Sequence, residues 1–541
     1  MIITSNEELA DIVEDPHNSQ ERIHSSTLPK DVIILKLIVT TAVMFSLFIS
    51  ESLTERRSYP LSNTSIHVTI LIITLIGLIS MVVMFCLKNN SDHFILKRLY
   101  EHHGGQTEKR SMATNFKKVV FVAFMVGTMC YYTVNIIYYI YCSTGESPIQ
   151  LFLYAAYLLF CILQPLFFIQ FTELQCSSSL ARCLVTLVLE VNISIYLRAI
   201  VRETFDVLNE ISSGTEGTAS EKNESSFNTF NNTCFNQSSL NLQISNIIES
   251  VSPYMYPLII EYSVMAMQSL FEILALSSNK HMEVSEQNML SYRQINERYT
   301  LLRTVKLTRF RTKHTVKRRM CKCRCSFIVG LLVGIPFAVF TFVASYTTNI
   351  EVQWIHKISE TIFTFFLLIS CVIGLVISLR ERNERDVQQV ASFGAGDIIY
   401  FIAVSSTSVF HAFALIASFT LLNSPITTSK TSIHFALYLE IFMFLGLLLQ
   451  TIFLRYCKTS LKYSVSTNIL VKDALTFVSV CNGILWVVNS FYPFYKLTNS
   501  HATYAEFYGA QAWALVFKIT VPLAIYYRFH SVLLCLESLS K

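Results

Sequence analysis

The sequence predicts an all-α membrane protein with about twelve transmembrane helices in two pseudo-repeated six-helix halves and with both termini cytoplasmic. Three observations predict it: an apolar composition, recurring apolar segments of membrane-spanning length, and short motifs that recur in the second half. Of the 541 residues, 52% are hydrophobic and 15% are charged, and the mean hydropathy is +0.46. This composition leaves too little polar surface to cover globular domains in water.

The apolar segments each run for about twenty residues, which lets a helix cross a hydrocarbon core of ~30 Å. The chain opens with the polar stretch MIITSNEELADIVEDPHNSQ rather than a signal peptide, so we expect the first span to act as its own insertion signal. The expected spans are Asp31–Ser50, His67–Leu87, Val119–Tyr141, Leu151–Phe171, Leu180–Val201, Tyr254–Leu276, Phe327–Tyr346, Ile358–Leu379, Ile398–Leu422, Ile433–Leu454, Ala474–Phe491 and Phe507–Leu534.

Basic residues set the expected orientation, because cytoplasmic loops carry an excess of Lys and Arg. These residues are densest in Lys280–Arg324 and next densest in Lys88–Lys118, so we expect both segments in the cytoplasm. The basic residues lie between apolar segments rather than along one soluble face, so we expect no nucleic-acid partner. N-glycosylation sequons fall in loops on the other side, as glycosylation requires. The expected glycosylation sites are Asn63, Asn223, Asn231 and Asn236.

The spans divide the chain into five expected parts. One long loop is rich in Ser, Asn, Thr and Gly, which is typical of a flexible glycosylated connection. The basic linker suits either a helix on an anionic leaflet or a plain connection between spans. Cys142 and Cys234 lie in expected extracellular loops, where a disulfide and two free thiols are both open. The parts are a cytoplasmic tail (1–30), an N-terminal half (31–276) with the extracellular loop (203–252), a cytoplasmic linker (277–325), a C-terminal half (326–535) and a short cytoplasmic tail (536–541).

Short motifs recur in the same order in the two halves, which indicates an internal duplication of the kind common in membrane transport proteins. The fourth span reads LQPLFFI with Gln164, and the tenth reads LQTIFLR with Gln450. The fifth span carries LEVNISIYL with Asn192, and the eleventh carries SVCNGILWV with Asn482. The sixth span has YPLIIEYS, and the twelfth has VPLAIYYRFHS.

Polar side chains inside these spans need partners, because an amide without one in hydrocarbon costs several kcal/mol. We expect the repeated Gln and Asn residues to face other helices or water, and plain helix-to-helix hydrogen bonds are one explanation of them. Ionisable residues are more expensive to bury, and some are interfacial. Glu261 and His530 stand out because apolar residues surround both. The ionisable set is Arg198, Glu203, Glu261, His411, Glu440, Lys518, Arg528 and His530.

The sequence offers little that would support catalysis. We find no nucleophile with a base, no metal-ligand set and no phosphate cradle, so we expect no enzyme activity, no metal and no cofactor. The Cys321–Cys325 run, CKCRC, has no partner at zinc-type spacing. A filter of the potassium-channel type is not found either. A path for protons does not need such a filter, because a proton moves along waters and along side chains that bind and release it, such as Glu, His and Tyr.

The residues resemble the otopetrin family. The closing segment EFYGAQAWALVFKITVPLAIYYRFHSVLLCLE, preceded by CNGILW, is similar to the family's C-terminal signature. The two LQ motifs, the fifth span with RET at Arg202–Thr204, and YPLIIEYS match in order. Two features depart from the family pattern: Glu190 precedes Asn192 where an uncharged residue is usual, and YYTVNIIYYI in the third span lacks an acidic residue.

The resemblance implies a proton-selective channel of the plasma membrane, opened in many members by extracellular acid. It also implies a homodimer whose subunits each contain two six-helix barrels, with protons and membrane lipids, either sterol or anionic, as partners. Within the family a glutamate and the histidine of YRFHS lie between the two halves, so Glu203 or Glu261 with His530 is the principal expectation. The residues implied in the proton pathway or its gating are Gln164, Asn192, Glu203, Glu261, Gln450, Asn482, Arg528 and His530.

Two other functions fit the residues. A secondary transporter that couples protons to a small solute would also use a repeat and polar spans. A signalling or scaffolding membrane protein that conducts nothing would account for the basic linker. A current evoked by acid alone distinguishes a channel from the transporter and from the non-conducting protein.

Overall fold

The structure, a computed structural model, is helical and confirms the predicted all-α membrane fold, whereas the cytoplasmic position of both termini stays a prediction. It describes residues 30–56, 60–89, 96–98, 112–141, 148–171, 174–176, 179–215, 251, 255–274, 313–347, 350–383, 395–423, 430–460, 469–491, 504–505 and 507–540. Eleven helices in these residues are long and apolar enough to cross a membrane. The helix at the first expected span, α1 (Lys30–Arg56), is not among the eleven.

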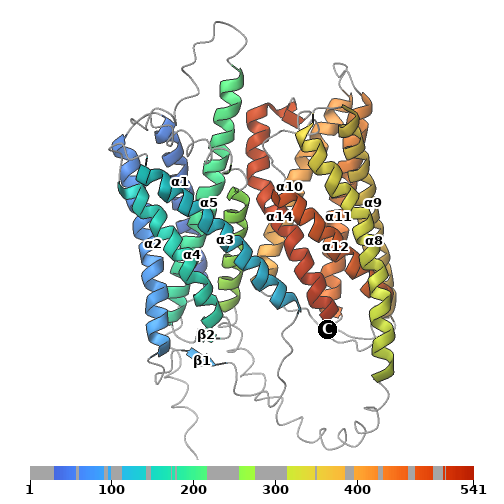
Figure 1. The fold of residues 1–541 in the computed structure, drawn as a ribbon, viewed down its shortest axis with the longest axis horizontal. Coiled ribbons are helices and arrows are strands. Elements are labelled where there is room, and N and C mark those ends of the chain that lie inside the picture. Colours follow the sequence, from blue (N-terminus) through green and yellow to red (C-terminus); the bar gives the residue numbers. More distant parts are fainter. Residues whose placement is uncertain are drawn as a thin grey trace, which may run out of the picture.

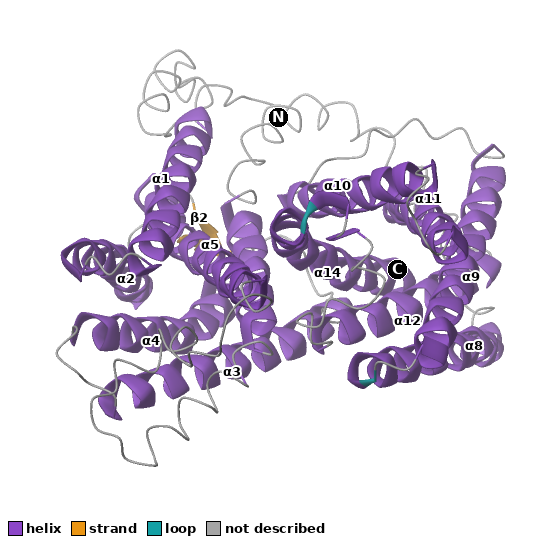
Figure 2. Ribbon diagram, turned by 90° about the horizontal axis from the view of Figure 1, so that it is seen from above, coloured by secondary structure: helices purple, strands orange, loops and turns teal. Residues whose placement is uncertain are grey.

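The helices form two groups that lie side by side (Figure 1). Seen from above, α3 of the first group extends toward the second (Figure 2). The first group, the N-half, contains α1, α2 (Pro60–Asn89), α3 (Met112–Tyr141), α4 (Pro148–Phe171), α5 (Ser179–Thr215) and the Met255–Leu274 helix. The second group, the C-half, contains α8 (Lys313–Tyr346), α9 (Ile350–Asn383), α10 (Ala395–Asn423), α11 (Lys430–Ser460), α12 (Ile469–Phe491) and α14 (Ala510–Ser540).

Packing follows the same order in both halves. In the N-half, α1 packs on α5, α2 packs on α4 and α5, and α3 packs on α4. In the C-half, α8 packs on α12, α9 packs on α11 and α12, and α10 packs on α11. The helices α8 to α12 therefore pack on one another in the same order as α1 to α5, as the internal repeat predicts.

A two-stranded ribbon interrupts the helical fold. Strand β1 (Leu96–Arg98) pairs antiparallel with β2 (Leu174–Cys176), and Lys97 lies opposite Gln175. These strands were not predicted, because three residues are too few to show a period of two. The ribbon lies at the lower end of the N-half in Figure 1, and we call this end of the bundle the ribbon end.

The start of the last span differs from the expected Phe507. The helix α14 begins at Ala510, after Gly509, whose φ of 86° suits glycine because it has no Cβ. The carbonyl oxygen of Gly509 accepts a bond from the amide of Trp513 at 3.0 Å. The chain's C-terminus lies at the ribbon end (Figure 1), so Trp513 lies at the opposite end.

The outer surface is apolar and the interior contains the polar side chains, which is the reverse of a soluble protein. Large side chains such as Ile169, Leu332 and Phe419 are exposed. Amides such as Gln164 and Asn482 are fully buried. This distribution fits a bundle surrounded by lipid, since polar groups in a membrane face other helices or water.

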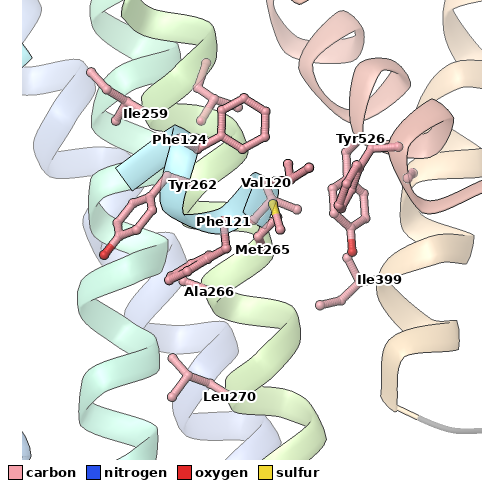
Figure 3. Packing of buried hydrophobic residues seen from close by; sticks show 14 of the residues in the cluster. Val120, Phe121, Phe124, Ile259, Tyr262, Met265, Ala266, Leu270, Ile399 and Tyr526 are labelled. Atoms are coloured by element: carbon pink, nitrogen blue, oxygen red, sulfur yellow. The ribbon is translucent and has the colours of Figure 1, made fainter. Parts of the chain in front are cut away.

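Aromatic and aliphatic side chains join the halves. The helix α14 contacts α3 and α5, and α14 and α5 are the most buried of the candidate spans. Trp486 of α12 contacts the rings of Phe116 and Phe124 of α3. Figure 3 shows Phe124 with Tyr262 and Met265 on one side and Tyr526 of α14 on the other. This interface brings the two halves into one packed core.

Candidate functional site

Between the halves, an ion pair links α5 to α14 near the end opposite the ribbon. The ammonium of Lys518 donates a hydrogen bond to a carboxylate oxygen of Glu203 at 2.7 Å. Both side chains are buried, with exposed fractions of 5% and 7%. Each charge therefore depends on the other, because an unpaired charge in this environment costs several kcal/mol. Glu203, one of the two glutamates expected beside His530, has Lys518 as its partner instead.

The second link between the halves is a hydrogen bond deeper in the bundle. The hydroxyl of Tyr526 on α14 donates to the side-chain oxygen of Gln268 on the Met255–Leu274 helix at 2.6 Å. The Nδ1 atom of His530 lies 3.4 Å from the same hydroxyl, and its ring lies 5.1 Å from that of Tyr400. Within the described residues, no hydrogen bond or ion pair joins His530 directly to Glu203 or Glu261. Tyr526, on the same helix, contacts the His530 ring, and Lys117 of α3 in the other half interacts with His530 electrostatically.

Glu261 is buried without a hydrogen-bond partner. It is 1% exposed, and neither carboxylate oxygen has a partner among the described residues. Electrostatic interaction couples it to Tyr196 and to Tyr526, the same tyrosine that contacts His530. Glu261 and His530 are thus related through Tyr526 rather than by direct contact.

In the C-half, the repeated amides bond to each other. Gln450 donates to Asn482 at 3.1 Å and accepts from the Asn482 amide at 3.2 Å. Gln450 also donates to the hydroxyl of Ser531 at 3.0 Å, and Arg528 donates to the oxygen of Asn482 at 3.3 Å. All four side chains are buried. The network joins α11, α12 and α14 through the residues that the repeat singled out.

In the N-half, the corresponding amides do not bond to each other. Gln164 accepts a hydrogen bond from the hydroxyl of Tyr262 at 2.6 Å, and its amide nitrogen has no partner in the described part of the chain. Asn192 donates to the carbonyl of Val188, and its oxygen has no partner there either. These buried atoms have unused capacity for hydrogen bonds to water.

A polar cluster lies at the end of the C-half opposite the ribbon. The Nδ1 atom of His411 on α10 lies 2.7 Å from a carboxylate oxygen of Glu440 on α11. The hydroxyl of Tyr504 donates to the other Glu440 oxygen at 3.1 Å. Burial, and then the Glu440 charge, raise the pKa of Tyr504 well above its ordinary value, so this phenol keeps its proton and acts as a donor. Glu360 of α9 interacts electrostatically with Glu440 and with Lys357, so two carboxylates and one lysine ammonium belong to the described cluster.

The N-half has a different cluster at the same end. A guanidinium nitrogen of Arg198 donates to a carboxylate oxygen of Glu51 at 2.7 Å. The Nδ1 atom of His67 lies 3.4 Å from the same oxygen, and the other ring nitrogen lies 2.8 Å from the amide nitrogen of Gln150. The ion pair is nine-tenths buried on both sides. We had not singled out Glu51 or His67 from the sequence, because each flanks a span end, where charged residues are ordinarily interfacial.

At the ribbon end of the C-half, one carboxylate holds two cations. Asp397 at the start of α10 is 2% exposed and lies 2.7 Å from Arg455 and 2.8 Å from Lys458 of α11. In the N-half, Glu190, the departure from the family pattern, lies 3.1 Å from Lys36 of α1. The carboxylate of Glu190 therefore lies beside the positive charge of Lys36.

Several expectations lie outside the described residues. These are the asparagines Asn223, Asn231 and Asn236 and both loop cysteines, Cys142 and Cys234. The CKCRC run falls within α8, but the side chains of Cys321 and Cys323 are not described. Asn63 falls within α2, but its side chain is not described. In the part of the chain that the structure covers, no group of three or more His, Cys, Asp or Glu side chains could hold a metal ion.

Comparison with protein families gives a match over more than half of the chain. The family described as Otopetrin matches residues 214–529. This region runs through the Met255–Leu274 helix and the C-half and ends within α14. It includes Glu261, Gln450, Asn482 and Arg528 and stops just before His530.

Curated relatives match over shorter regions. The chain is 21% identical over 304 residues to "Proton channel OtopLc" of Drosophila melanogaster, covering 54% of this chain and 17% of that protein. It is 36% identical over 66 residues to "Proton channel OTOP2" of Homo sapiens and to the protein of the same name of Mus musculus, covering 12% of this chain and 11% of each relative. The matches thus span less than a fifth of the length of each of these relatives.

Proposed function

The chain belongs to the otopetrin family, and from that premise we propose that it conducts protons selectively across the plasma membrane. All three relatives reported above are named proton channels, which supports the same conducted ion here. We further propose that extracellular acid opens or modulates the channel, and that two copies form a homodimer.

The observation that carries this proposal is the set of titratable side chains buried between the halves. Glu203 and Lys518 pair there, and Tyr526 contacts both Gln268 and His530. A bundle that needed only mechanical stability would fill this interface with apolar residues, because a buried ion pair gives little net stability. Ionisable groups inside a span are by default associated with ion paths or proton relays.

We assign roles from the geometry. Glu261, Tyr526 and His530 form a sequence of groups that can accept and release protons, separated by gaps that water would have to bridge. The amides Gln164, Asn192, Gln450 and Asn482 order water, and Arg528 holds Asn482 in place. Glu203 contributes through its pair with Lys518, which ties the halves together.

The orientation follows from the basic segments. We place the ribbon end in the cytoplasm, because β1 lies within the basic stretch Lys88–Lys118 and cytoplasmic segments are enriched in Lys and Arg. Both termini are then cytoplasmic, the five parts keep the bounds given above, and the four sequons face outward. The clusters around Glu440 and Glu51 then lie toward the extracellular side, where external acid reaches them first. Anionic or sterol lipids would contact the outer apolar surface.

The test is whole-cell recording while external pH is lowered in steps. For a proton-selective conductance, the reversal potential follows the proton gradient by about 59 mV per pH unit. We expect His530→Ala to reduce the current or shift its dependence on pH. His434→Ala serves as the matched control, because His434 is an exposed histidine of α11 outside the interface.

Surface labelling of each variant separates loss of current from loss of protein at the membrane. A wild-type protein that reaches the surface but whose reversal potential ignores the proton gradient contradicts the proposal. Saturable uptake of a solute without current under acid alone would favour a proton-coupled transporter instead.

A further inference from the structure

The Met255–Leu274 helix has a row of polar side chains that interact with α14. Glu261, Gln268 and Glu272 follow one another at about two turns and then one turn, which places them on one side of the helix. Gln268 bonds to Tyr526 of α14, and both glutamates interact with Tyr526 electrostatically. The exposed fraction rises along the row from 1% at Glu261 and 4% at Gln268 to 40% for the Glu272 side chain. Because this helix runs toward the ribbon end (Figure 1), the row leads from the buried interface to the surface at that end.

Hydrogen bonds connect Tyr526 to Glu272. The hydroxyl of Tyr526 donates to the side-chain oxygen of Gln268 at 2.6 Å, and the amide nitrogen of Gln268 donates to the Glu272 carboxylate at 2.8 Å. Lys117 of α3 donates to both oxygens of the same carboxylate, at 3.0 and 3.2 Å. The Nδ1 atom of His530 lies 3.4 Å from the Tyr526 hydroxyl. These residues form one connected series from the histidine of the interface to a partly exposed carboxylate.

Stability alone does not account for the end of this series. The ion pair between Lys117 and Glu272 is partly exposed, with side-chain exposed fractions of 22% and 40%, and such pairs add little to stability. A partly exposed carboxylate at the end of a buried polar row suits a different role. It can take up a proton that arrives from the interior and release that proton to bulk water.

The Glu272 carboxylate has capacity for a further hydrogen bond. A carboxylate offers about four acceptor positions, and Lys117 and Gln268 together use three of them. The amide of Gln268 has no proton to release near neutral pH, so it holds Glu272 in line with Tyr526 and does not pass protons itself. Water bridges this step, because protons move along chains of water and titratable side chains.

We infer that Glu272 is the group through which protons leave the interface between the halves at the ribbon end, with Gln268 and Lys117 as the residues that position it. A protonated water at the interface transfers its proton to the Glu272 carboxylate, where an O–H bond forms and neutral water remains. The proton then passes to bulk water, which restores the carboxylate. The inference rests on the proposed proton conduction and on the cytoplasmic position of the ribbon end. It adds to the pathway a residue that the sequence had not singled out.

The test is whole-cell recording from cells that express the full chain, while external pH is lowered in steps. Glu272→Gln keeps the size of the side chain but cannot take up the proton. We expect its current to fall about tenfold, a conservative figure because a positioned proton-transfer group contributes about 100-fold or more. Glu272→Asp keeps a carboxylate and should retain most of the current. Glu537→Gln is the matched control and should conduct like the wild type, because Glu537 is a partly buried glutamate of α14 outside the series.

Chemical rescue separates proton transfer from a structural role. Imidazole in the pipette solution takes up protons near neutral pH at the cytoplasmic face. We therefore expect it to restore part of the current of Glu272→Gln and to leave the wild type and Glu537→Gln unchanged. A residue that only stabilised the bundle would give a variant that does not respond to this buffer. Currents are normalised to surface protein.

A second variant covers the case in which Glu272→Gln does not reach the surface. Lys117→Gln combined with Glu272→Gln replaces the ion pair by two amides, so neither charge is left without its partner. The double variant lacks the proton acceptor as well, and we expect the same loss of current and the same rescue by imidazole.

Four results would overturn the inference. Wild-type current in Glu272→Gln does so and leaves the proposed function standing, provided that the reversal potential follows the proton gradient. A reduced current that imidazole does not restore, at normal surface level, means that the role of Glu272 is structural. Rescue by imidazole in the bath but not in the pipette places Glu272 on the extracellular side. A wild type whose reversal potential ignores the proton gradient overturns the proposed function together with this inference.

Discussion

The N-half and the C-half have the same order of helix packing but different polar interiors. Gln450 and Asn482 of the C-half exchange two hydrogen bonds, whereas Gln164 and Asn192 of the N-half have separate partners and unused atoms. The duplicated fold thus has polar residues at the same positions in both halves but does not have the same hydrogen bonds between them. The position of a residue in the repeat therefore predicts that its side chain is buried better than it predicts its hydrogen-bond partner.

The contrast extends to the clusters opposite the ribbon end. In the C-half, the cluster contains two carboxylates, Glu360 and Glu440, with Lys357 near the first and His411 bonded to the second. In the N-half, the cluster pairs one carboxylate, Glu51, with the guanidinium of Arg198. A cluster with two carboxylates attracts protons more strongly than a cluster with one, so we expect the two halves to differ as entrances.

The largest expected difference between the halves is in stability. Arg198→Met removes the guanidinium that is bonded to the buried carboxylate of Glu51, and breaking a buried pair in this way costs about 3–5 kcal/mol. His411→Leu leaves Glu440 with the hydroxyl of Tyr504, so we expect a loss of only about 1–2 kcal/mol. Unfolding midpoints of the purified variants measure both.

A double variant that removes both charges of the N-half ion pair tests whether the loss of stability comes from the unpaired carboxylate. Arg198→Met combined with Glu51→Gln should recover part of the stability lost by Arg198→Met, because no carboxylate is then left without its cation. An equal loss of unfolding free energy in Arg198→Met and His411→Leu would contradict this difference, because it would mean that the two clusters stabilise their halves equally.

The second difference is in proton entry and rests on the proposed function. Glu440→Gln removes a negative charge from the C-half cluster, and we expect the acid-evoked current to fall about tenfold, the lower range of electrostatic focusing. Glu190→Gln removes an N-half carboxylate beside Lys36 and is expected to change the current less than about twofold. Currents normalised to surface protein compare the two. A larger loss in Glu190→Gln would assign proton entry to the N-half.

Much of the fold was predictable because the signals are local. An apolar run of about twenty residues is read without knowing the rest of the chain, and each expected span has its helix. The eight polar residues proposed for the pathway are all buried. A Gln or Asn amid apolar residues is enough to predict that.

Partners could not be predicted, because they depend on how helices far apart in the sequence come together. Glu203 and Lys518 are 315 residues apart, and no pattern in either span indicates the pair. Glu51 and His67 were missed for a related reason: a charge at a span end looks interfacial until packing buries it. A glutamate and a histidine on either side of one short loop are the only signal that could have found them.

The smallest expected difference tests the amides, which gave the first sign of the repeat. Gln450→Leu removes bonds to Asn482 and Ser531, and at about 0.6 kcal/mol for each hydrogen bond inside a membrane the loss should be about 1–2 kcal/mol. Gln164→Leu removes one bond, from Tyr262, and also removes an amide nitrogen that has no partner in the described residues, so its loss should stay near 0.6 kcal/mol or below. Unfolding midpoints rank the two variants. A larger loss of stability in Gln164→Leu would contradict this ranking. It would mean that waters give the N-half amides hydrogen bonds as strong as those between Gln450 and Asn482. The polar groups of the two halves would then differ in their partners but contribute equally to stability.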